Sequence, residues 1–398
     1  MSGLSALSNP RFRIYYLGAI AGVNGNWIFR VLLSWLAWDV THDPSFVGLI
    51  AASSLAPVAL TTPFFGALAD RMDILKAYRI VLFGMLVAPS SLLLLMYSGH
   101  LAALPLLGIA ITFGVMLSAY QPVRQSLGPR LVDPPEISSV IALGSLNFNV
   151  GRLLSPAIGG VLIGEYGTMT AAIVSISLFL PALVIAPLLR PRERALKIAP
   201  TSYLTDLREG IRVGWQEIPV RRSLLLTVLA LGPVRAVTEI LALIADGSFE
   251  RGATGLGLLT SGVGAGALLA ALFLVAAGPR LARMRTLRYG IIAMGFAATI
   301  ALSLAPTFPL AIAAAIPMGF TGTYVGVSLQ IGMQARLADE LRGRIMSLWL
   351  LSVTLSTSAL SLTISALSEW AGIGGAVTTV IVIAAVLVTF VVLRFSRA

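Results

Sequence analysis

Long, uninterrupted apolar runs recur along the whole of this 398-residue sequence. Each is about 20 residues long, the length at which an α-helix crosses the hydrocarbon core of a bilayer. Strands of a membrane barrel would instead alternate apolar and polar residues over about ten positions, and these runs do not. We therefore expect an all-α membrane protein with twelve spans, at approximately 14–38, 46–69, 77–97, 102–124, 138–163, 168–189, 222–245, 254–277, 287–305, 308–333, 345–368 and 372–393.

The composition excludes several other classes of protein. Hydrophobic residues make up 57% of the chain and charged residues 11%, whereas a soluble domain has about 25% charged residues. A cytosolic enzyme, a secreted disulfide scaffold and a disordered chain are excluded on this ground. The absence of cysteine, together with only two histidines, His42 and His100, both near expected span ends, predicts no metal site and no cofactor. The first apolar run is too long for a signal peptide, so no cleaved segment is expected.

The formal net charge of +11 is explained by topology. Most Lys and Arg residues fall in loops on one side of the expected membrane, and Arg251 is the exception in an opposite loop. This bias places both termini in the cytoplasm. The basic excess is therefore a topology signal and a contact for anionic membrane lipids, and nucleic-acid binding is not expected.

The connection between the sixth and seventh spans divides the chain into two halves. It is the longest connection, and its apolar residues recur at helical spacing, which predicts an amphipathic helix at the cytoplasmic interface: Leu204, Leu207, Ile211, Trp215 and Ile218. We expect an N-terminal six-helix bundle at 1–190, a linker at 191–221 and a C-terminal six-helix bundle at 222–398. Parallel halves of this kind are a transporter architecture.

Several motifs resemble those of one transporter superfamily. The end of the second span reads Gly66-Ala67-Leu68-Ala69-Asp70-Arg71, similar to the loop signature of the major facilitator superfamily, and the fifth span carries Gly151 and Ser155-Pro156-Ala157-Ile158-Gly159-Gly160, similar to its antiporter motif. Three further segments resemble bacterial multidrug, macrolide and siderophore exporters: 9–13, 121–125 and 340–344. The resemblance implies the major facilitator fold and a monomeric drug:proton antiporter of small molecules in the bacterial inner membrane.

Two positions depart from the pattern of those exporters. The loop signature usually continues with a glycine and two or three basic residues, whereas here only Lys76 follows. The exporters also commonly carry a Gly-Asp pair in the first span, where this chain has Gly25-Asn26. Because an amide cannot release a proton, a proton-carrying role does not transfer to Asn26, which stays a candidate for substrate contact.

The loop signature and the antiporter motif each have a physical interpretation. Gly66 lets helices approach closely, and Asp70 with Arg71 can pair with a neighbouring span and latch one conformation; alternatively, the two charges simply end the span at the headgroups. In the fifth span, small residues at three- and four-residue spacing together with a proline predict a bend and close helix packing: Gly151, Ser155, Pro156, Gly159 and Gly160.

Charged residues at membrane depth are the strongest functional candidates, because each costs at least about 2.5–3.5 kcal/mol at a helix centre. Four are expected there: Arg30, Arg152, Arg235 and Glu239. Arg235 and Glu239 are four residues apart and can form an ion pair on one helix face. The resemblance implies that the first and seventh spans line a central cavity. The alternative is a structural role, in which each arginine binds carbonyls or a neighbouring helix.

These charges predict the chemistry of the substrate. Three arginines against one glutamate leave a formal excess of two positive charges, which favours anionic or zwitterionic substrates over lipophilic cations. Glu239 is the expected proton carrier, and the alternative is a permanent pair that neutralises the span. Tyr120 and Tyr324 are further candidates for substrate contact, although such residues more often join helices.

Competing functions differ in what they require. No GxxxxGK[ST] loop is present, so this chain does not bind ATP through that motif. An importer or a lipid flippase is the first alternative to an exporter. An intramembrane enzyme or sensor is the second, and an enzyme would need a nucleophile and base or a metal site, for which no histidine lies at membrane depth.

Overall fold

The computed structural model describes residues 5–192, 203–334 and 339–395, and within these ranges it contains helices and no strands. The expected all-α class is confirmed. The α-helices are α1 (Pro10–Thr41), α2 (Pro44–Arg71), α3 (Ile74–Tyr97), α4 (Ala103–Leu127), α5 (Ile137–Tyr166), α6 (Thr168–Ile185), α7 (Tyr203–Gln216), α8 (Ile218–Leu226), α9 (Gly232–Glu239), α10 (Leu241–Ala245), α11 (Gly252–Arg283), α12 (Arg285–Ser303), α13 (Phe308–Gln334) and α14 (Asp339–Arg394). Short 3-10 turns lie at Ser5–Ser8, Gly128–Leu131, Pro134–Glu136 and Ala186–Leu188.

Nine helices in the described parts of the chain are long and apolar enough to cross a membrane. They are α2 to α6 and α11 to α14. The remaining expected spans correspond to α1, whose middle carries Asn24, Asn26 and Arg30, and to the interrupted segment from α8 to α10. Helix α1 is outside the set of nine because of these polar side chains, and the α8 to α10 segment because each of its helices is short.

Two of the long helices contain a glycine in the left-handed region. Gly278 has φ 71° in α11 and Gly372 has φ 67° in α14. Only glycine adopts this conformation without a steric penalty. Gly372 therefore divides α14 at the boundary that the sequence places between the runs 345–368 and 372–393, and α14 accounts for both runs.

The expected seventh span is broken into pieces. Pro233 has no N–H to donate to the preceding turn, and there the backbone forms a π-helical turn, η5 (Thr227–Leu231), in which the Gly232 N–H donates to the Thr227 carbonyl. A second break follows at Ile240, whose N–H donates to the Val237 carbonyl at 3.2 Å. π-helical turns such as η5 are frequent at functional sites. The two breaks together bound α9, and Glu239 is its last residue.

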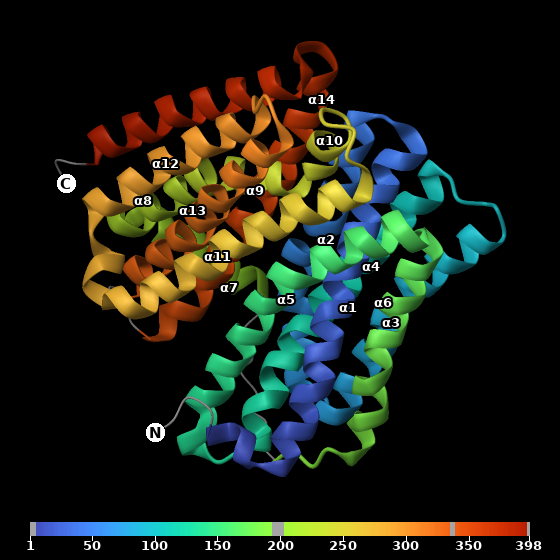
Figure 1. Ribbon diagram of the computed structural model, residues 1–398. Coiled ribbons are helices and arrows are strands. Elements are labelled where there is room, and N and C mark those ends of the chain that lie inside the picture. The colour runs from blue at the N-terminus through green and yellow to red at the C-terminus, as the bar shows by residue number, and fades with distance from the viewer. Residues whose placement is uncertain (1–4, 193–202, 335–338, 396–398) are drawn as a thin grey trace.

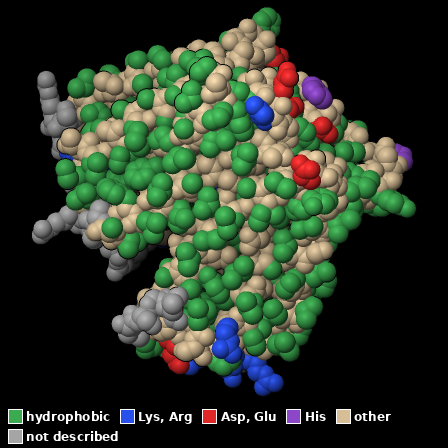
Figure 2. Space-filling view, viewed as in Figure 1, with side chains coloured by type: hydrophobic (Ala, Val, Ile, Leu, Met, Phe, Trp, Pro, Cys, Tyr) green, Lys and Arg blue, Asp and Glu red, His purple; other side chains and the backbone are tan. Residues whose placement is uncertain are grey.

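The helices gather in two groups (Figure 1). Helices α1 to α6 occupy the lower right of the view, and helices α8 to α14 the upper left. The two groups meet where α5 packs against α11 and where α2 packs against α14. In the space-filling view, Lys and Arg side chains gather mainly at the lower end, near the N-terminus, and acidic and histidine side chains mainly at the opposite end (Figure 2). Hydrophobic side chains cover the surface between these ends.

The linker segment contains the expected helix, α7. Ile211 is 50% exposed and Trp215 is 70% exposed. Gly214, on another side of the helix, is buried, and a Cβ added there would meet Leu224 and Leu348 at 3.2 Å. Helix α7 therefore packs on the helices around it through one side and presents apolar side chains outward. The side chains of Leu204 and Leu207 lie outside the described residues.

Candidate functional site

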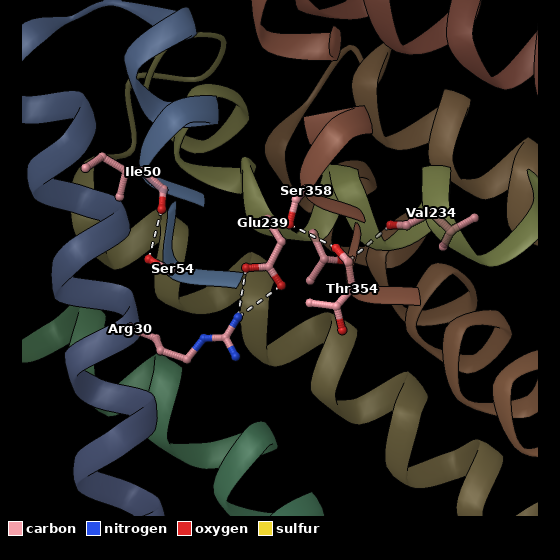
Figure 3. Close-up of polar contacts among 8 residues, drawn as sticks. Arg30, Ile50, Ser54, Val234, Glu239, Thr354 and Ser358 are labelled. Atoms are coloured by element: carbon pink, nitrogen blue, oxygen red, sulfur yellow. Dashed lines mark hydrogen bonds and ion pairs between the residues drawn. The ribbon is translucent and has the colours of Figure 1, made fainter. Parts of the chain in front are cut away.

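An ion pair joins the two groups of helices. The Arg30 Nη2 of α1 donates to the Glu239 Oε2 at 2.8 Å and to the Oε1 at 3.0 Å, from the end of α9 (Figure 3). About a quarter of each side chain is exposed, 25% for Arg30 and 22% for Glu239. The expected pair within one helix, Arg235 with Glu239, is not the one formed. The four-residue spacing permits it, but α1 brings Arg30 to the carboxylate.

The pair lies on the wall of a small cavity, which we call the arginine chamber. The chamber has a volume of about 180 Å³. Four elements contribute its polar and charged walls: Arg30 and Ser34 from α1, Arg152 from α5, Thr238 with Arg235 and Glu239 from α9, and Thr260 from α11. The structure thus brings together all four charged residues that the sequence places at membrane depth.

Two of the three guanidinium groups in the arginine chamber have no anionic partner. Neither Arg152 nor Arg235 forms an ion pair or a side-chain hydrogen bond within the described residues, whereas Arg30 is bound by Glu239. A formal excess of two positive charges therefore faces a cavity inside a bundle of apolar helices. Electrostatic interactions are stronger in such a setting than in water. The chamber favours an anionic group.

Aromatic rings form the wall between the arginine chamber and a second cavity. The Arg30 guanidinium carbon lies 5.1 Å from the Trp27 ring centroid, and the Trp27 ring lies 5.8 Å from that of Phe148. Phe148 also lines the second cavity, of about 850 Å³, which we call the vestibule. Helices α1, α2, α4, α5 and α14 contribute to the vestibule, near the end of α1 where the chain begins.

Three further predicted site residues lie elsewhere. Asn26 is buried, and its Oδ1 has no hydrogen-bond partner in the described structure. Tyr120 packs against Phe179, and no partner for its hydroxyl is described. The Tyr324 hydroxyl donates to the Leu281 carbonyl at 3.0 Å, which joins α13 to α11. None of the three lines the arginine chamber or the vestibule.

The loop signature lies at the end of α2, and the close packing expected at Gly66 is absent among the described residues. A Cβ added at Gly66 would meet none of their atoms within 4 Å. No described helix approaches closely at this position. Arg71 is exposed and ends α2, and the side chain of Asp70 lies outside the described residues.

The residues of the antiporter-like motif do pack closely, as expected. A Cβ at Gly151 would meet Val23 Cγ1 of α1 at 2.8 Å, and one at Gly160 would meet the Ala253 carbonyl oxygen of α11 at 2.5 Å. The Ser155 hydroxyl donates to Asn24 Oδ1 of α1. The Pro156 carbonyl oxygen lies 2.5 Å from a Cβ placed on Gly257. Gly159 is looser, with 3.5 Å to its first neighbour.

Two features of the structure have no signal in the sequence pattern. Phe148 is an apolar residue in an apolar helix, so nothing separates it from core residues until the cavities are known. The second is a contact near the far ends of α1 and α10, where Trp38 Nε1 donates to Asp246 Oδ2 at 2.8 Å and the Gly252 N–H donates to Oδ1 at 2.9 Å. Both residues lie at expected span ends, where aromatic and acidic residues are ordinary. No cluster of three metal-ligating side chains occurs among the described residues.

Comparison with known proteins identifies the family. A family model described as transmembrane secretion effector matches residues 1–397. The chain is 22% identical over 344 residues to the multidrug efflux pump Tap of Mycolicibacterium fortuitum, over 84% of this chain and 83% of the pump. It is 29% identical over 166 residues to the staphyloferrin A transporter of Staphylococcus aureus (strain NCTC 8325 / PS 47). That alignment covers 41% of this chain and only 42% of the relative.

Solved structures show the same fold at low sequence identity. One is a bacterial homolog to the human lysosomal transporter Spinster in an inward-facing and unoccupied conformation, with a TM-score of 0.74 at 15% identity over 96% of this chain and 97% of that chain. Another is the nucleoside transporter NupG, with a TM-score of 0.74 at 13% identity over 95% and 99% of the two chains. The family and these relatives are transporters rather than enzymes. The chain belongs to the transmembrane secretion effector family of the major facilitator superfamily.

Proposed function

We propose that this protein is a proton-coupled exporter of small organic molecules with an anionic group, either anions or zwitterions, that works by alternating access. The arginine chamber is the single observation that carries the proposal. It holds an excess of positive charge, lies where the two groups of helices meet, and is crossed by an ion pair that must rearrange if the groups separate. Substrate sites at such an interface are typical of transporters built from two halves.

The proposed architecture has twelve spans in two six-helix bundles, 1–190 and 222–398, joined by the linker 191–221. The nine apolar helices support it, because α14 contains two expected spans and α1 and the α8 to α10 segment supply the other two. Both termini are assigned to the cytoplasm of a bacterial cell, with the protein a monomer in the inner membrane. The separation of basic and acidic side chains toward opposite ends agrees with this orientation (Figure 2).

Arg152 and Arg235 are assigned to the substrate. Their guanidinium groups face the arginine chamber without an anionic partner in the described structure. A carboxylate, sulfonate or phosphate there gains charge-assisted hydrogen bonds, which are roughly twice as strong as bonds between neutral groups. A lipophilic cation meets two uncompensated like charges and is disfavoured. The substrate is therefore selected by charge.

Glu239 is assigned to the proton. When it is charged, its carboxylate holds Arg30 and so holds α9 against α1. Protonation removes the charge that makes this contact strong, so proton binding favours separation of the two helices. In export the two sites are occupied in turn: the anion leaves Arg152 and Arg235 on the outside, Glu239 then takes up a proton, and this proton is released inside after the protein returns.

The direction of transport is supported by the relatives. The multidrug efflux pump Tap aligns with most of the chain, and the staphyloferrin A transporter with less than half of it. An importer or a lipid flippase is the alternative. Both use the same fold, but neither is favoured by a contact in the arginine chamber.

Efflux from cells tests the proposal. Cells with and without the protein are loaded with a labelled organic acid or with ethidium, and accumulation is followed before and after a proton uncoupler is added. We expect reduced accumulation of the acid, reversed by the uncoupler, and no effect on ethidium. Efficient export of ethidium that is undiminished in Arg30→Gln or Arg152→Gln would refute it, and raised accumulation of the acid would indicate an importer.

A further inference from the structure

The size of the arginine chamber limits what it can hold. Sites for drug-sized ligands have volumes of about 300–1,000 Å³. The chamber, at about 180 Å³, is below this range, whereas the vestibule, at about 850 Å³, is within it. A charged group with a few carbon atoms fits the chamber. Anything larger extends into the vestibule.

The side chain of Phe148 connects the two cavities. It lines both, and its ring contacts Trp27, whose ring in turn lies beneath the Arg30 guanidinium. A ligand that extends from the arginines into the vestibule therefore has to pass the Phe148 ring, which lies beside Trp27. Such rings favour an apolar or aromatic ligand body over a strongly hydrated one.

The vestibule is suited to the apolar part of a ligand. Most of its walls are apolar or aromatic side chains, including Phe12, Val58, Val140, Ile141 and Leu350. Arg124 is its one charged lining residue within the described structure, and no carboxylate lines it. A cation finds no unpaired carboxylate among the described lining residues of either cavity, because Glu239 in the arginine chamber is bound by Arg30.

Two buried hydrogen-bond donors belong to residues that line the cavities on either side of Phe148. Trp27 Nε1 in the arginine chamber and Asn147 Nδ2 in the vestibule are buried donors without a partner in the described structure, and their residues are only 9% and 5% exposed. Neither atom is open to a ligand in this conformation, so the fit of a ligand rests on the charged walls of the chamber and the apolar walls of the vestibule.

We propose that the substrate is an amphipathic organic anion whose charged group binds in the arginine chamber and whose apolar body lies in the vestibule, past Phe148. This inference rests on the proposed anion selectivity and adds the second half of the ligand. It predicts that affinity depends on two separable properties, the charge of the head and the length of the apolar body.

A series of ω-phenylalkanoates tests these properties separately. Phenylacetate, 4-phenylbutyrate and 6-phenylhexanoate are titrated calorimetrically into the protein in lipid nanodiscs, with empty nanodiscs as the blank and the matching phenylalkylamines as charge-reversed ligands. We expect the affinity of the carboxylates to rise about fourfold for each methylene that becomes fully buried. The amines should bind at least about tenfold more weakly than the carboxylates, because one charge-assisted hydrogen bond is worth about 1.5–3 kcal/mol.

Gly144 offers a variant that fills the vestibule alone. It lines the vestibule in α5, and a Cβ there meets nothing within 4 Å. Gly144→Leu should abolish most of the gain from the longer bodies and leave phenylacetate unchanged. Gly108→Leu is the matched control, because Gly108 lies in α4 with equal space and lines neither cavity.

The outcomes separate the two proposals. Carboxylates that bind equally well at every length, or a Gly144→Leu variant that behaves like Gly108→Leu, would overturn the vestibule inference and leave anion selectivity intact. Amines that bind as tightly as the carboxylates would overturn the proposed function itself. The wild-type series decides the first question even if Gly144→Leu does not fold.

Discussion

Arg30 and Glu239, 209 positions apart in sequence, form an ion pair of 2.8 Å that joins α1 to α9. Both side chains are partly exposed, and pairs open to water contribute little to stability, so the position of this pair is what matters. It closes the contact between the two groups of helices and leaves Arg152 and Arg235 as the arginines open to a ligand.

Substitution of Glu239 by glutamine tests the proton carrier. The amide retains one oxygen that accepts from Arg30 but cannot exchange a proton. We expect proton-driven export to be abolished while exchange of substrate across the membrane continues, measured in proteoliposomes with and without a pH gradient. Export by Glu239→Gln at the normal rate and with the normal pH dependence would make the residue structural.

Close packing of α5 on α11 is tested by two alanine substitutions in neighbouring positions. A Cβ at Gly160 meets backbone atoms of α11 at 2.5 and 2.9 Å, whereas a Cβ at Gly159 has 3.5 Å of room. Overpacking costs about 1–3 kcal/mol, which disfavours this conformation by about fivefold or more. Gly160→Ala should therefore slow transport strongly and Gly159→Ala should not. Equal effects of both would show that the contact does not form during transport.

The contact between Trp38 and Asp246 lies near the C-terminal ends of α1 and α10. We expect it to keep the arginine chamber closed on that side. Hydrogen bonds to charged groups contribute about 1.5–3 kcal/mol, so Trp38→Phe should raise the open population about tenfold or more. Because the chain has no cysteine, a single Ser34→Cys substitution in the chamber wall reports opening through labelling by an impermeant maleimide from outside intact cells. Trp35→Phe is the control. Unchanged labelling in Trp38→Phe would show that the Trp38–Asp246 hydrogen bond does not keep the chamber closed.

Membrane orientation is tested in the same way. His100→Cys and Arg251→Cys should react with the impermeant reagent from outside intact cells, whereas Gln216→Cys, exposed on α7, should react only after the cells are opened. We expect this because most Lys and Arg residues lie in the loops on the side of α7, and such loops face the cytoplasm. Labelling of position 216 from outside would reverse the assigned topology.

Much of the helical framework is predictable from the sequence because it depends on local patterns. Apolar runs at 77–97 and 308–333 correspond to α3 and α13, and the boundary near Gly372 follows from the flanking runs. That the four charged residues at membrane depth lie together is also predictable. A charge buried among apolar helices is costly, so such residues face a polar cavity.

Contacts between distant helices are not predictable in this way. The sequence shows that Glu239 can reach Arg235, but only the approach of α1 decides that it binds Arg30. Gly66 looks like a packing glycine and has open space beside it, whereas Tyr324 looks like a ligand contact and holds α13 to α11. Phe148 carries no local signal, because its role depends on two cavities formed by other helices.

The dissociation constant of 4-phenylbutyrate for the wild type, Arg152→Gln and Arg235→Gln shows whether the chamber arginines bind the substrate anion. Arg13→Gln is the control for an exposed arginine outside both cavities. Loss of one charge-assisted contact costs about 1.5–3 kcal/mol. We predict that each chamber variant binds the carboxylate at least about tenfold more weakly, and that Arg13→Gln binds like the wild type. Unchanged affinity in both Arg152→Gln and Arg235→Gln would contradict an arginine chamber that binds the substrate anion.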